Sequence, residues 1–473
     1  MSKQDYTYIF NDLSDGYASV QWVHHHTHRS PHTFRVRVGD QQFHRKRHWE
    51  QRYHLSALQA DCVDLASAIA VADRLSSRKG YQPCSIHIHL PVRHPELFGS
   101  LQTLQHLQDI LYWYTQDEWV FDFLPRSAFG RAAERQLSFL NPNACDLPTE
   151  VALWSGGLDS LAGLFSRLKN RIADSHYVLF GTGTNTFIQS KQRDTAEAID
   201  ALFPSRTTLV QVPLWLDETK EMRKHSLQRS RGFVFLLLGA ICAMLEGQQE
   251  LYVYENGIGA INLPFTLAEV GLDHSLSVHP VSLIRMGEFV SHLFGSLFTF
   301  QNPFLFQTKA QMCAPLATEM AFERLVLSTF TCDRYLRDQP QQCGRCSSCL
   351  LRRQAIAVLN VGEDPTSYSM TTPRHERQKS RNSDGDHLRA MEIQVASLRA
   401  CLATEKPWES LSGYAPQLLE IVDEMTVKKL FARDRLIDDL IQLYATYVSE
   451  WDERVCQVVH RGFAEYTIEQ QRL

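Results

Sequence analysis

The segment that most constrains the fold of this chain is Val151–Gly163, with the sequence V-A-L-W-S-G-G-L-D-S-L-A-G. Its first residues are apolar and predict a short buried strand, and the apolar-periodic run from Leu158 predicts a helix. Between them, Gly156 and Gly157 allow a tight turn, because glycine adopts backbone angles closed to other residues. The order strand, glycine turn and helix is typical of a phosphate-binding loop, since the first turn of a helix attracts anions.

Polar side chains lie next to this turn. Ser155, Asp159 and Ser160 place two hydroxyls and one carboxylate beside the start of the helix, so we expect them to act on a bound polyphosphate. The G-x-x-x-x-G-K-[ST] pattern of the common nucleotide-binding loop is absent. The alternative is an ordinary Ser-Gly-Gly turn between a strand and a helix.

Strands and helices alternate after this turn. The predicted strands are His176–Phe180, Thr208–Val212 and Glu250–Tyr254, and the predicted helices are Gln189–Leu202 and Phe233–Leu245. This alternation is typical of a parallel sheet, which binds ligands at the carboxyl ends of its strands. Two of the strands lead into F-G-T-G at Phe180–Gly183 and E-N-G at Glu255–Gly257, which we expect at the same edge. Alternatively, these glycines only turn the chain.

The flanking segments have different patterns. Residues 1–147 predict an α+β domain, residues 148–362 the parallel α/β domain, residues 363–387 a polar linker and residues 388–473 a helical region. The predicted N-terminal elements are strands at His32–Val38, Ser85–Leu90 and Trp119–Leu124 and helices at Asp61–Leu75 and Leu101–Tyr114. The predicted C-terminal helices are Leu388–Leu402 and those within Pro416–Val448, where an apolar stripe from Leu436 to Val448 indicates packed core.

Histidines are dense in the N-terminal segment. One group comprises His24, His25, His26, His28 and His32, and a second pair, His87 and His89, lies two residues apart on one face of a predicted strand. No cysteine or carboxylate at matching spacing accompanies either group in the sequence. We therefore interpret them as surface and loop histidines and not as a metal site.

Composition excludes several classes of protein. The 473 residues have a net charge of −5 without a long single-sign run, so we do not expect direct binding to nucleic acid. The first residues lack the apolar run of a signal peptide, and apolar runs stay shorter than a membrane span. We therefore expect a cytoplasmic protein without a membrane segment.

Four of the eleven cysteines form the pattern C-x10-C-x2-C-x2-C; they are Cys332, Cys343, Cys346 and Cys349. Four thiolates suit a tetrahedral structural zinc ion, with an iron–sulfur cluster as the alternative. Disulfides are disfavoured because a reducing cytoplasm keeps such thiols reduced. The adjacent Arg352 and Arg353 open a predicted helix, and we consider them as cations that steer anionic ligands.

The string S-G-G-L-D-S at Ser155–Ser160 resembles the PP-loop of ATP pyrophosphatases. Together with C-G-R-C-S-S-C-L-L-R at Cys343–Arg352, it resembles the 7-cyano-7-deazaguanine synthase family. S-R-G-F-V-F-L at Ser230–Leu236 and N-P-F-L-F-Q-T-K at Asn302–Lys309 are similar to further pieces of that family. The long flanking segments and E-N-G-I-G-A-I-N-L-P-F at Glu255–Phe265 look more like synthase-like proteins of bacterial anti-phage operons.

The resemblance implies a PP-loop fold for roughly residues 150–360 and the cofactors ATP, Mg²⁺ and Zn²⁺. It also implies that the carboxylate of a 7-deazaguanine attacks the α-phosphate of ATP to form an acyl-adenylate. Ammonia, or the amino terminus of an operon-encoded partner protein, would then displace AMP. The expected product is therefore an amide of a 7-deazaguanine.

The resemblance assigns roles to individual residues. The expected catalytic residues are Ser155, Asp159, Ser160 and Lys309. The expected ATP-binding residues are Leu153, Trp154, Ser155, Gly156, Gly157, Leu158, Asp159 and Ser160, with Phe180, Gly181 and Gly183 near the adenine. The expected substrate-binding residues are Arg231, Glu255, Asn256, Gly257 and His279. Arg229, Arg231 and Lys309 are candidate cations for the carboxylate and the phosphates, and for Arg229 a surface salt bridge is an equally good interpretation. For His279, turn capping and general-base work are equally good interpretations.

Two other functions remain open from the sequence. A tRNA-modifying PP-loop enzyme that inserts sulfur would need a catalytic cysteine, and Cys242 and Cys313 are the candidates in the core of the central domain. A non-catalytic interaction module is the second alternative, although the intact S-G-G-L-D-S string weighs against it.

Overall fold

The computed structural model describes residues 4–11, 17–25, 32–39, 55–78, 82–126, 149–170, 175–183, 185–217, 228–265, 276–333, 340–369 and 386–470. Within these residues, one ten-stranded sheet runs through the N-terminal and central segments, in the order β10-β9-β6-β7-β8-β3-β2-β1-β4-β5. The strands are β1 (Gln4–Phe10), β2 (Tyr17–His24), β3 (His32–Val38), β4 (Cys84–Val92), β5 (Glu118–Pro125), β6 (Thr149–Leu153), β7 (His176–Gly183), β8 (Thr207–Asp217), β9 (Glu250–Tyr252) and β10 (Thr299–Gln301).

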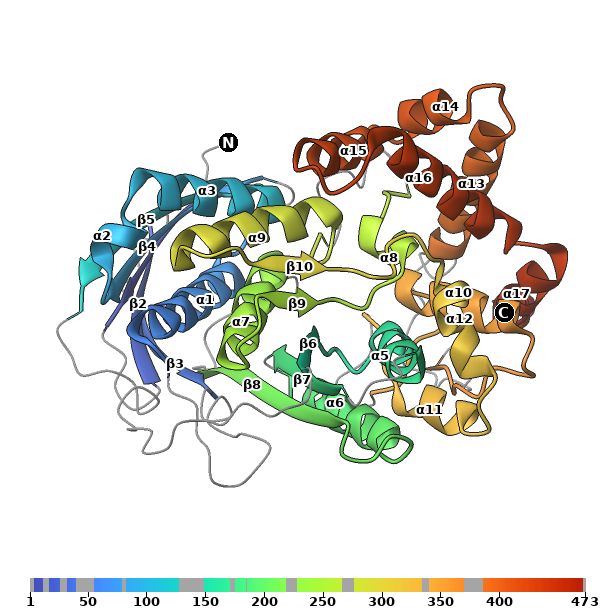
Figure 1. The fold of residues 1–473 in the computed structure, drawn as a ribbon, viewed down its shortest axis with the longest axis horizontal. Helices are drawn as coiled ribbons and strands as arrows, with labels where there is room; N and C mark the ends of the chain where they lie inside the picture. Colours follow the sequence, from blue (N-terminus) through green and yellow to red (C-terminus); the bar gives the residue numbers. More distant parts are fainter. Residues whose placement is uncertain are drawn as a thin grey trace.

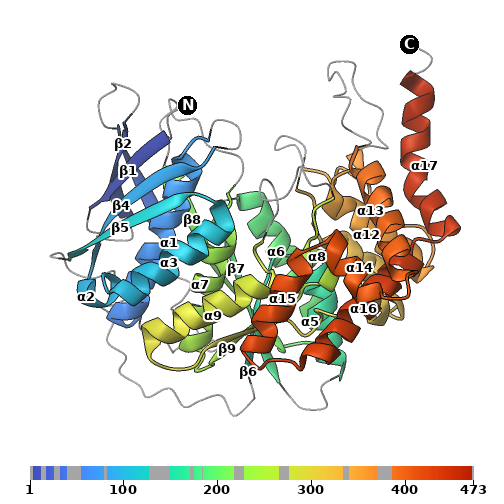
Figure 2. The same ribbon diagram turned by 90° about the horizontal axis from the view of Figure 1, so that it is seen from above.

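Helices cover the sheet and form the C-terminal region (Figure 1). They are α1 (Ala57–Leu75), α2 (Pro95–Phe98), α3 (Leu101–Thr115), α5 (Leu158–Asn170), α6 (Thr186–Asp200), α7 (Arg231–Leu245), α8 (Gly257–Ile261), α9 (Pro280–Phe294), α10 (Lys309–Ala317), α11 (Phe322–Ser328), α12 (Ser347–Leu359), α13 (Asp386–Leu402), α14 (Pro407–Tyr414), α15 (Gln417–Val427), α16 (Arg433–Ser449) and α17 (Glu453–Gln470). In Figures 1 and 2 the N-terminal strands and the C-terminal helices lie at opposite ends of the molecule.

The central part of the sheet is parallel, as predicted. Strands β10, β9, β6, β7 and β8 pair in parallel, and α5, α6 and α7 connect β6, β7, β8 and β9 in sequence. The α/β class is therefore confirmed. Strand β9 ends at Tyr252, two residues earlier than predicted, and its parallel partner β10 is equally short.

Strand β8 joins the central strands to the N-terminal strands because it has two pairing partners. Its first part pairs in parallel with β7, up to the register Gly183↔Pro213. Its last four residues, Leu214–Asp217, pair antiparallel with β3 instead. Pro213 cannot donate to a neighbouring strand, but its carbonyl accepts a hydrogen bond from Gly39 N at 2.7 Å. A strand predicted to end at Val212 therefore continues, and both segments share one sheet.

The C-terminal helices share a core with the central region. Leu436, Leu440, Tyr444 and Tyr447 of α16 are buried, as the apolar stripe predicts. They cluster with apolar residues of the central region, which are Ala260, Ile261, Leu263, Val281, Leu305, Leu350 and Ala357. The predicted Pro416–Val448 segment forms two helices, α15 and α16, and most of the predicted linker, residues 370–385, lies outside the described residues.

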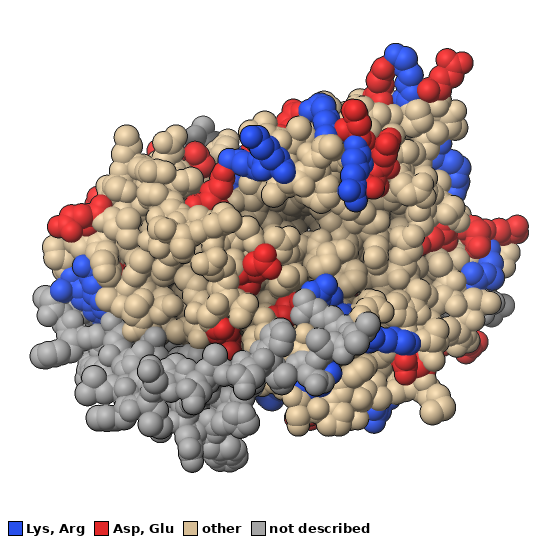
Figure 3. Space-filling view, in the orientation of Figure 1, with Lys and Arg blue, Asp and Glu red and all other residues tan. Residues whose placement is uncertain are grey.

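The surface visible in Figure 3 mixes both signs of charge. Lysine, arginine, aspartate and glutamate side chains are interspersed there, and uncharged residues cover most of the area. Among the described residues, none of the helices combines the length and the apolar character needed to cross a membrane.

Candidate active site and metal centre

The Ser-Gly-Gly turn connects β6 to α5, as the sequence predicts. Gly156 has a φ of +74°, and a Cβ atom there would lie 2.9 Å from the backbone nitrogen of Gln192. A side chain would therefore strain the backbone and collide with α6. Ser155 Oγ lies 2.8 Å from Ser160 Oγ and accepts a hydrogen bond from Gly157 N at 3.1 Å. The two hydroxyls thus lie together at the start of α5.

The apolar residues of the loop anchor it to the core. Trp154 and Leu158 are 2% and 1% exposed, and Trp154 Nε1 donates to the carbonyl of Gln192 at 2.9 Å. Leu153 is partly buried. These side chains point away from any ligand on the turn, so their contribution to ATP binding would come from their backbone.

A buried ionic cluster lies directly behind the turn. Asp159, in the first turn of α5, accepts a hydrogen bond from Asn256 Nδ2 at 3.0 Å through Oδ1, and Lys309 Nζ donates to its Oδ2. Asn256 Nδ2 also donates to Glu255 Oε1 at 2.9 Å. Asp159, Lys309 and Asn256 are 7%, 4% and 0% exposed. Residues from three distant segments therefore form one polar cluster beside Ser155–Ser160.

The termini of two helices position this cluster. Asn256 is the N-cap of α8, and its Oδ1 accepts from Gly259 N at 3.0 Å. Lys309 is the first residue of α10, whose N-cap Thr308 forms a capping box with Gln311. Each side chain therefore starts from a rigid helix end, and the amide and ammonium groups converge on one carboxylate.

The C-terminal region supports the same helix ends. A Cβ atom at Gly257 would lie 2.0 Å from the carbonyl oxygen of Leu305 and 2.7 Å from Leu443 of α16, so only glycine fits there. Thr308 Oγ1 donates to Glu450, at the end of α16, and Gln354 Nε2 donates to the other oxygen of Glu450 at 3.1 Å. Glu450 gives no signal in the sequence, because it only becomes a partner of Thr308 after the helices pack.

The charges in the cluster are strongly coupled. Desolvation of its carboxyl group, together with the charge of Asp159, raises the pKa of Glu255 to about 8. Burial acts to lower the pKa of Lys309, but the carboxylates of Asp159 and Glu255 outweigh it and raise that pKa. At neutral pH Lys309 is therefore charged, and Glu255 largely keeps its proton.

Replacing Glu255 with glutamine is expected to change the pH dependence of stability. Because the folded-state pKa of Glu255 is about 8 and its ordinary pKa is 4.5, the native state binds more protons than the unfolded state between these values. The stabilisation that protonated Glu255 provides is therefore complete below pH 4.5 and is lost as the pH rises through 8. Glu255→Gln should remove this loss and exceed the wild type by on the order of 2 kcal/mol at pH 8.5.

Thermal unfolding measured from pH 4.5 to 8.5 checks this expectation. The exposed Glu250, which accepts a hydrogen bond from Tyr252, provides the control variant Glu250→Gln. The profiles of wild type and Glu255→Gln should converge near pH 4.5 and separate progressively as the pH rises towards 8. Parallel profiles for the two proteins would show that Glu255 does not titrate in this range.

The proposed adenine region lies at the end of β7. Phe180 is 1% exposed and its side chain belongs to the core, and its carbonyl accepts from Trp154 N at 2.7 Å. Gly181 faces α6, since a Cβ atom there would lie 2.5 Å from Gln192 Oε1. Gly183 has a φ of +137° and open space around its Cα, and it lines a pocket with Trp215, Arg231 and Phe235.

Arg231 and His279 lie apart from the ionic cluster in their contacts. The Arg231 guanidinium lies 4.7 Å from the centre of the Phe235 ring and lines the pocket at Gly183. His279 is 2% exposed and is the N-cap of α9, where its Nδ1 accepts from Val281 N at 3.3 Å. Burial lowers the pKa of His279 to about 3, with a further contribution from Arg285, so the ring is neutral. The turn-capping role is the one that the geometry shows.

Other polar residues near the site were missed in the sequence. Gln192 of α6 lies between the loop and β8: its carbonyl accepts from Trp154, and its Oε1 accepts from Gln211 Nε2 at 2.8 Å. Arg229, a candidate cation, instead donates to the carbonyl of Thr115 at 3.1 Å. These residues lack a recognisable spacing, so their contacts depend on tertiary packing.

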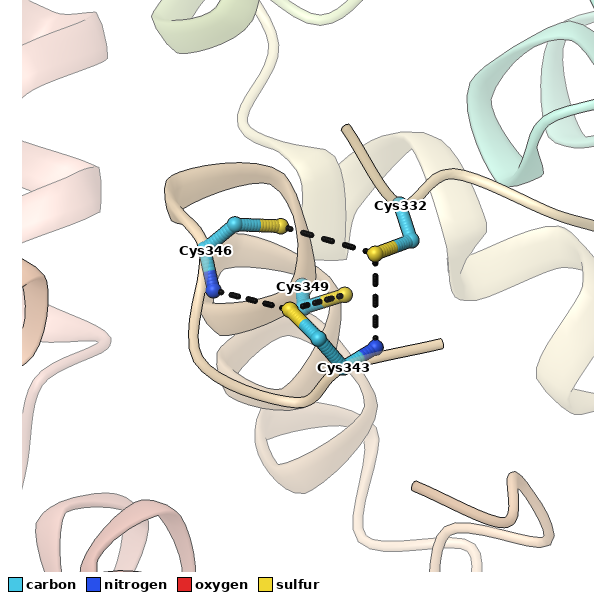
Figure 4. A group of neighbouring side chains, drawn as sticks. All are labelled: Cys332, Cys343, Cys346 and Cys349. Atoms are coloured by element: carbon cyan, nitrogen blue, oxygen red, sulfur yellow. Dashed lines mark hydrogen bonds between the residues drawn. The ribbon is translucent and has the colours of Figure 1, made fainter. Parts of the chain in front are cut away.

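The four predicted cysteines form a buried cluster (Figure 4). Cys332 Sγ lies 4.0 Å from Cys346 Sγ, and Cys343 Sγ lies 3.9 Å from Cys349 Sγ. Sulfur atoms bound to one tetrahedral ion at about 2.3 Å would be about 3.8 Å apart, so the spacing fits a single metal ion. The backbone nitrogens of Arg345 and Cys346 donate to Cys343 Sγ at 3.4 and 3.2 Å. These bonds favour a thiolate, and the neighbouring thiols lower the pKa of Cys343.

The prediction that Arg352 and Arg353 steer anionic ligands is wrong. Arg352 is 0% exposed and donates to Thr329 Oγ1 at 2.6 Å and to the carbonyl of Val326 at 2.8 Å. Arg353 is buried and donates to the carbonyl of Gly344 at 3.1 Å. Both guanidinium groups satisfy backbone carbonyls around the cysteines, so they stabilise the metal centre and do not reach solvent ligands.

The metal centre contacts the Ser-Gly-Gly turn through a short segment. Phe330 N, two residues before Cys332, donates to the carbonyl of Gly156 at 3.0 Å. The side chain of Thr331 lies against Gly157, where a Cβ atom would be 3.1 Å from Thr331 Cγ2. The position of the turn therefore depends on the segment that the cysteine cluster holds.

No protein-family model matches this chain, and no curated protein matches it at a significant level. The function is therefore inferred from the motifs and from the geometry of the described residues.

Proposed function

We propose that this protein is an ATP-dependent, AMP-forming carbon–nitrogen ligase, similar to 7-cyano-7-deazaguanine synthase, that activates a 7-deazaguanine carboxylate. The observation that carries the proposal is the buried Lys309–Asp159 pair directly behind the Ser155–Ser160 turn. A buried pair of this kind is costly to maintain for stability alone, because both charges lose their hydration. Because the pair lies beside a turn that would bind phosphates, Lys309 could contact those phosphates.

The first step joins the substrate carboxylate to the α-phosphate of ATP. A carboxylate oxygen attacks the α-phosphorus, the bond to the bridging oxygen breaks, and pyrophosphate leaves with its electron pair. The phosphates would lie against Ser155–Ser160, where the backbone of the turn and the Ser155 and Ser160 hydroxyls meet. Lys309 would stabilise the negative charge that develops on the phosphate oxygens.

The second step transfers the acyl group to an amine. The amine nitrogen attacks the acyl carbon, AMP leaves, and the nitrogen loses a proton. The acceptor would be ammonia or the amino terminus of a partner protein, as in the synthase-like proteins of anti-phage operons that the sequence resembles. Glu255 and Asn256, beside Asp159, are the candidates to contact the amino and carbonyl groups of the deazaguanine.

The residues present fit a magnesium ion. Asp159 and Glu255 offer two carboxyl groups in one buried cluster, where desolvation and then repulsion from Asp159 raise the pKa of Glu255. A divalent cation would relieve this repulsion, and oxygen ligands are those that Mg²⁺ prefers. When bound with ATP, the ion would neutralise charge on the departing pyrophosphate.

Zinc is the metal that we propose for the four cysteines. Four buried sulfurs leave no coordination position for a substrate, which is the pattern of a structural site. The spacing of the sulfurs suits one ion better than a cluster, in which the thiolates bind different iron atoms.

The two cysteines that a sulfur-inserting enzyme would use are poorly suited to that chemistry. Cys242 and Cys313 are 3% and 1% exposed. Burial raises the pKa of both thiols, in the case of Cys313 to about 12 with a contribution from Asp159. A thiol with a raised pKa forms little of the reactive thiolate.

Incubation of the purified protein with ATP, Mg²⁺, 7-carboxy-7-deazaguanine and an amine acceptor, first ammonium and then partner-protein peptides, tests the proposal. We expect AMP and pyrophosphate to form in equal amounts, and Ser155→Ala to lower the rate by about 10²-fold, because the hydroxyl lies where the phosphates would bind. Ser166→Ala is the matched control, because Ser166 lies on the same helix and its hydroxyl accepts a hydrogen bond from Asn170 Nδ2 at 3.3 Å. Absence of AMP with ammonium ions and with partner-protein peptides alike would refute the ligase.

A further inference from the structure

His87 and His89 gain a carboxylate partner from the neighbouring strand. Strand β4 has a period-two burial pattern, so Ile86, Ile88 and Leu90 are buried, whereas His87 and His89 lie on the opposite face of the sheet. Strand β5 pairs with β4 in parallel, and Asp122 lies beside His89 in the register. The three side chains therefore share one face of the sheet, although Asp122 is 33 residues from His89 in the sequence.

The three side chains converge on a small volume. His87 Nε2 lies 2.8 Å from Asp122 Oδ2, and His89 Nδ1 lies 3.2 Å from the same oxygen. The two rings lie 4.3 Å apart, centre to centre. One nitrogen from each ring and one carboxylate oxygen all lie within 4.8 Å of one another.

We propose that His87, His89 and Asp122 bind a divalent transition-metal ion, for which zinc is the best match to the ligands. Two imidazole nitrogens and one carboxylate oxygen are a usual set of zinc ligands. Ligand atoms at about 2.0–2.1 Å from a tetrahedral ion are about 3.3 Å apart, close to the 2.8 and 3.2 Å seen between the oxygen and the nitrogens. Small side-chain rotations are therefore enough to admit the ion.

The chemistry of the three groups favours a cation over a simple hydrogen-bonded cluster. The His87 contact with Asp122 is a hydrogen bond of 2.8 Å, whereas the His89 nitrogen lies 3.2 Å from the same oxygen. A divalent ion would offer both rings a bond through a nitrogen lone pair and would bind the carboxylate oxygen as well. The side chains of His87, His89 and Asp122 are 35%, 27% and 49% exposed. A bound ion would therefore keep at least one open position for water or an external ligand.

The site would cross-link the edge of the sheet. Strand β5 is the last strand in the sheet order and pairs with β4 alone. A metal held by two residues of β4 and one of β5 would fasten this edge strand. Metal bound to the native state stabilises it by mass action, so zinc should raise the unfolding temperature of this part of the protein.

Equilibrium binding of Co²⁺ and Zn²⁺ to the full-length protein tests the proposal. With the cysteine cluster loaded first, we expect one further equivalent, with a cobalt spectrum of nitrogen and oxygen ligands that lacks sulfur charge-transfer bands. Single variants His87→Ala, His89→Ala and Asp122→Asn should each weaken this second equivalent by at least about 10-fold. His460→Ala is the matched control, because His460 pairs with a single carboxylate, Glu392.

The outcomes separate clearly. Loss of the second equivalent in the three variants, with retention in His460→Ala and with unchanged circular dichroism, supports the site. A wild-type protein that binds only the cysteine-bound ion, or variants that keep the second equivalent, would overturn it. The cobalt spectrum distinguishes sulfur ligands from nitrogen ligands. Loss of metal from the cysteine cluster would therefore be detected independently of binding at His87, His89 and Asp122.

Discussion

Replacing Lys309 with methionine is expected to lower the rate of AMP release from ATP by about 10² to 10³-fold while the protein remains folded. Methionine has a similar length but no charge, so Asp159 loses the partner of its Oδ2 atom and the phosphates lose a cation. Removal of one charged group that stabilises a transition state lowers the rate by about 10² to 10³-fold. Breaking a buried ion pair also costs stability, on the order of 3 kcal/mol. Single-turnover AMP formation and thermal unfolding measure the two effects separately.

Lys169 provides a matched control. Its ammonium group pairs with Glu319 at 2.9 Å, but this pair is exposed, with side chains 43% and 32% accessible. Lys169→Met should therefore change neither the rate nor the stability by much. If Lys309→Met retained the wild-type rate of AMP formation, Lys309 and Asp159 would form a structural pair and the active site would lie elsewhere.

Loss of metal from the cysteine cluster is expected to impair both stability and the Ser-Gly-Gly turn. Replacing Cys343 with serine removes one of four ligands and the acceptor of two backbone N–H groups. Structural zinc contributes on the order of 10 kcal/mol of binding free energy, so we expect a fall of roughly 10 °C in the unfolding midpoint. The amide proton of Phe330, which bonds to the carbonyl oxygen of Gly156, should exchange faster with solvent. The reason is that Cys332, two residues later, no longer anchors this segment to a metal ion.

Elemental analysis, thermal unfolding and hydrogen exchange check this prediction together. Cys401→Ser is the control, since Cys401 is half-buried in α13 and lies outside the cluster. Purified wild-type protein should contain zinc, and a chelator should reproduce the effect of Cys343→Ser. A metal-free wild-type protein with full stability, or a Cys343→Ser variant with unchanged exchange at Phe330, would contradict the coupling between the metal centre and the turn.

The features that could be predicted from the sequence are those carried by short-range patterns. The Ser155–Ser160 turn, the alternation of strands and helices after it and the four clustered cysteines all lie within local spacing rules. For this reason the parallel α/β class and the cysteine cluster were predicted correctly. The two strands β1 and β2 were missed, although in β1 the buried Tyr6, Tyr8 and Phe10 alternate with the partly buried Thr7 and Ile9 in the pattern of a strand.

The sequence could not show contacts whose two partners lie on different segments. His87 and His89 were interpreted as surface histidines, and their contact with Asp122 arises only through the pairing of β4 with β5. Arg352 and Arg353 looked like free cations because the carbonyls that they contact, such as those of Val326 and Gly344, carry no sequence signal. In each case, packing against another segment determined which groups the side chain contacts.

The sequence by itself determined the turn, the helix that follows it and the metal-ligand set, because each depends on residue types a few positions apart. Only the tertiary structure decided that Asn256 and Lys309 meet Asp159, that Phe330 contacts Gly156 and that Glu450 accepts a hydrogen bond from Thr308, the residue before Lys309. These contacts join residues 97 to 174 positions apart. Side-chain hydrogen bonds over such separations form only after the apolar faces of the helices have packed, and no local pattern encodes them.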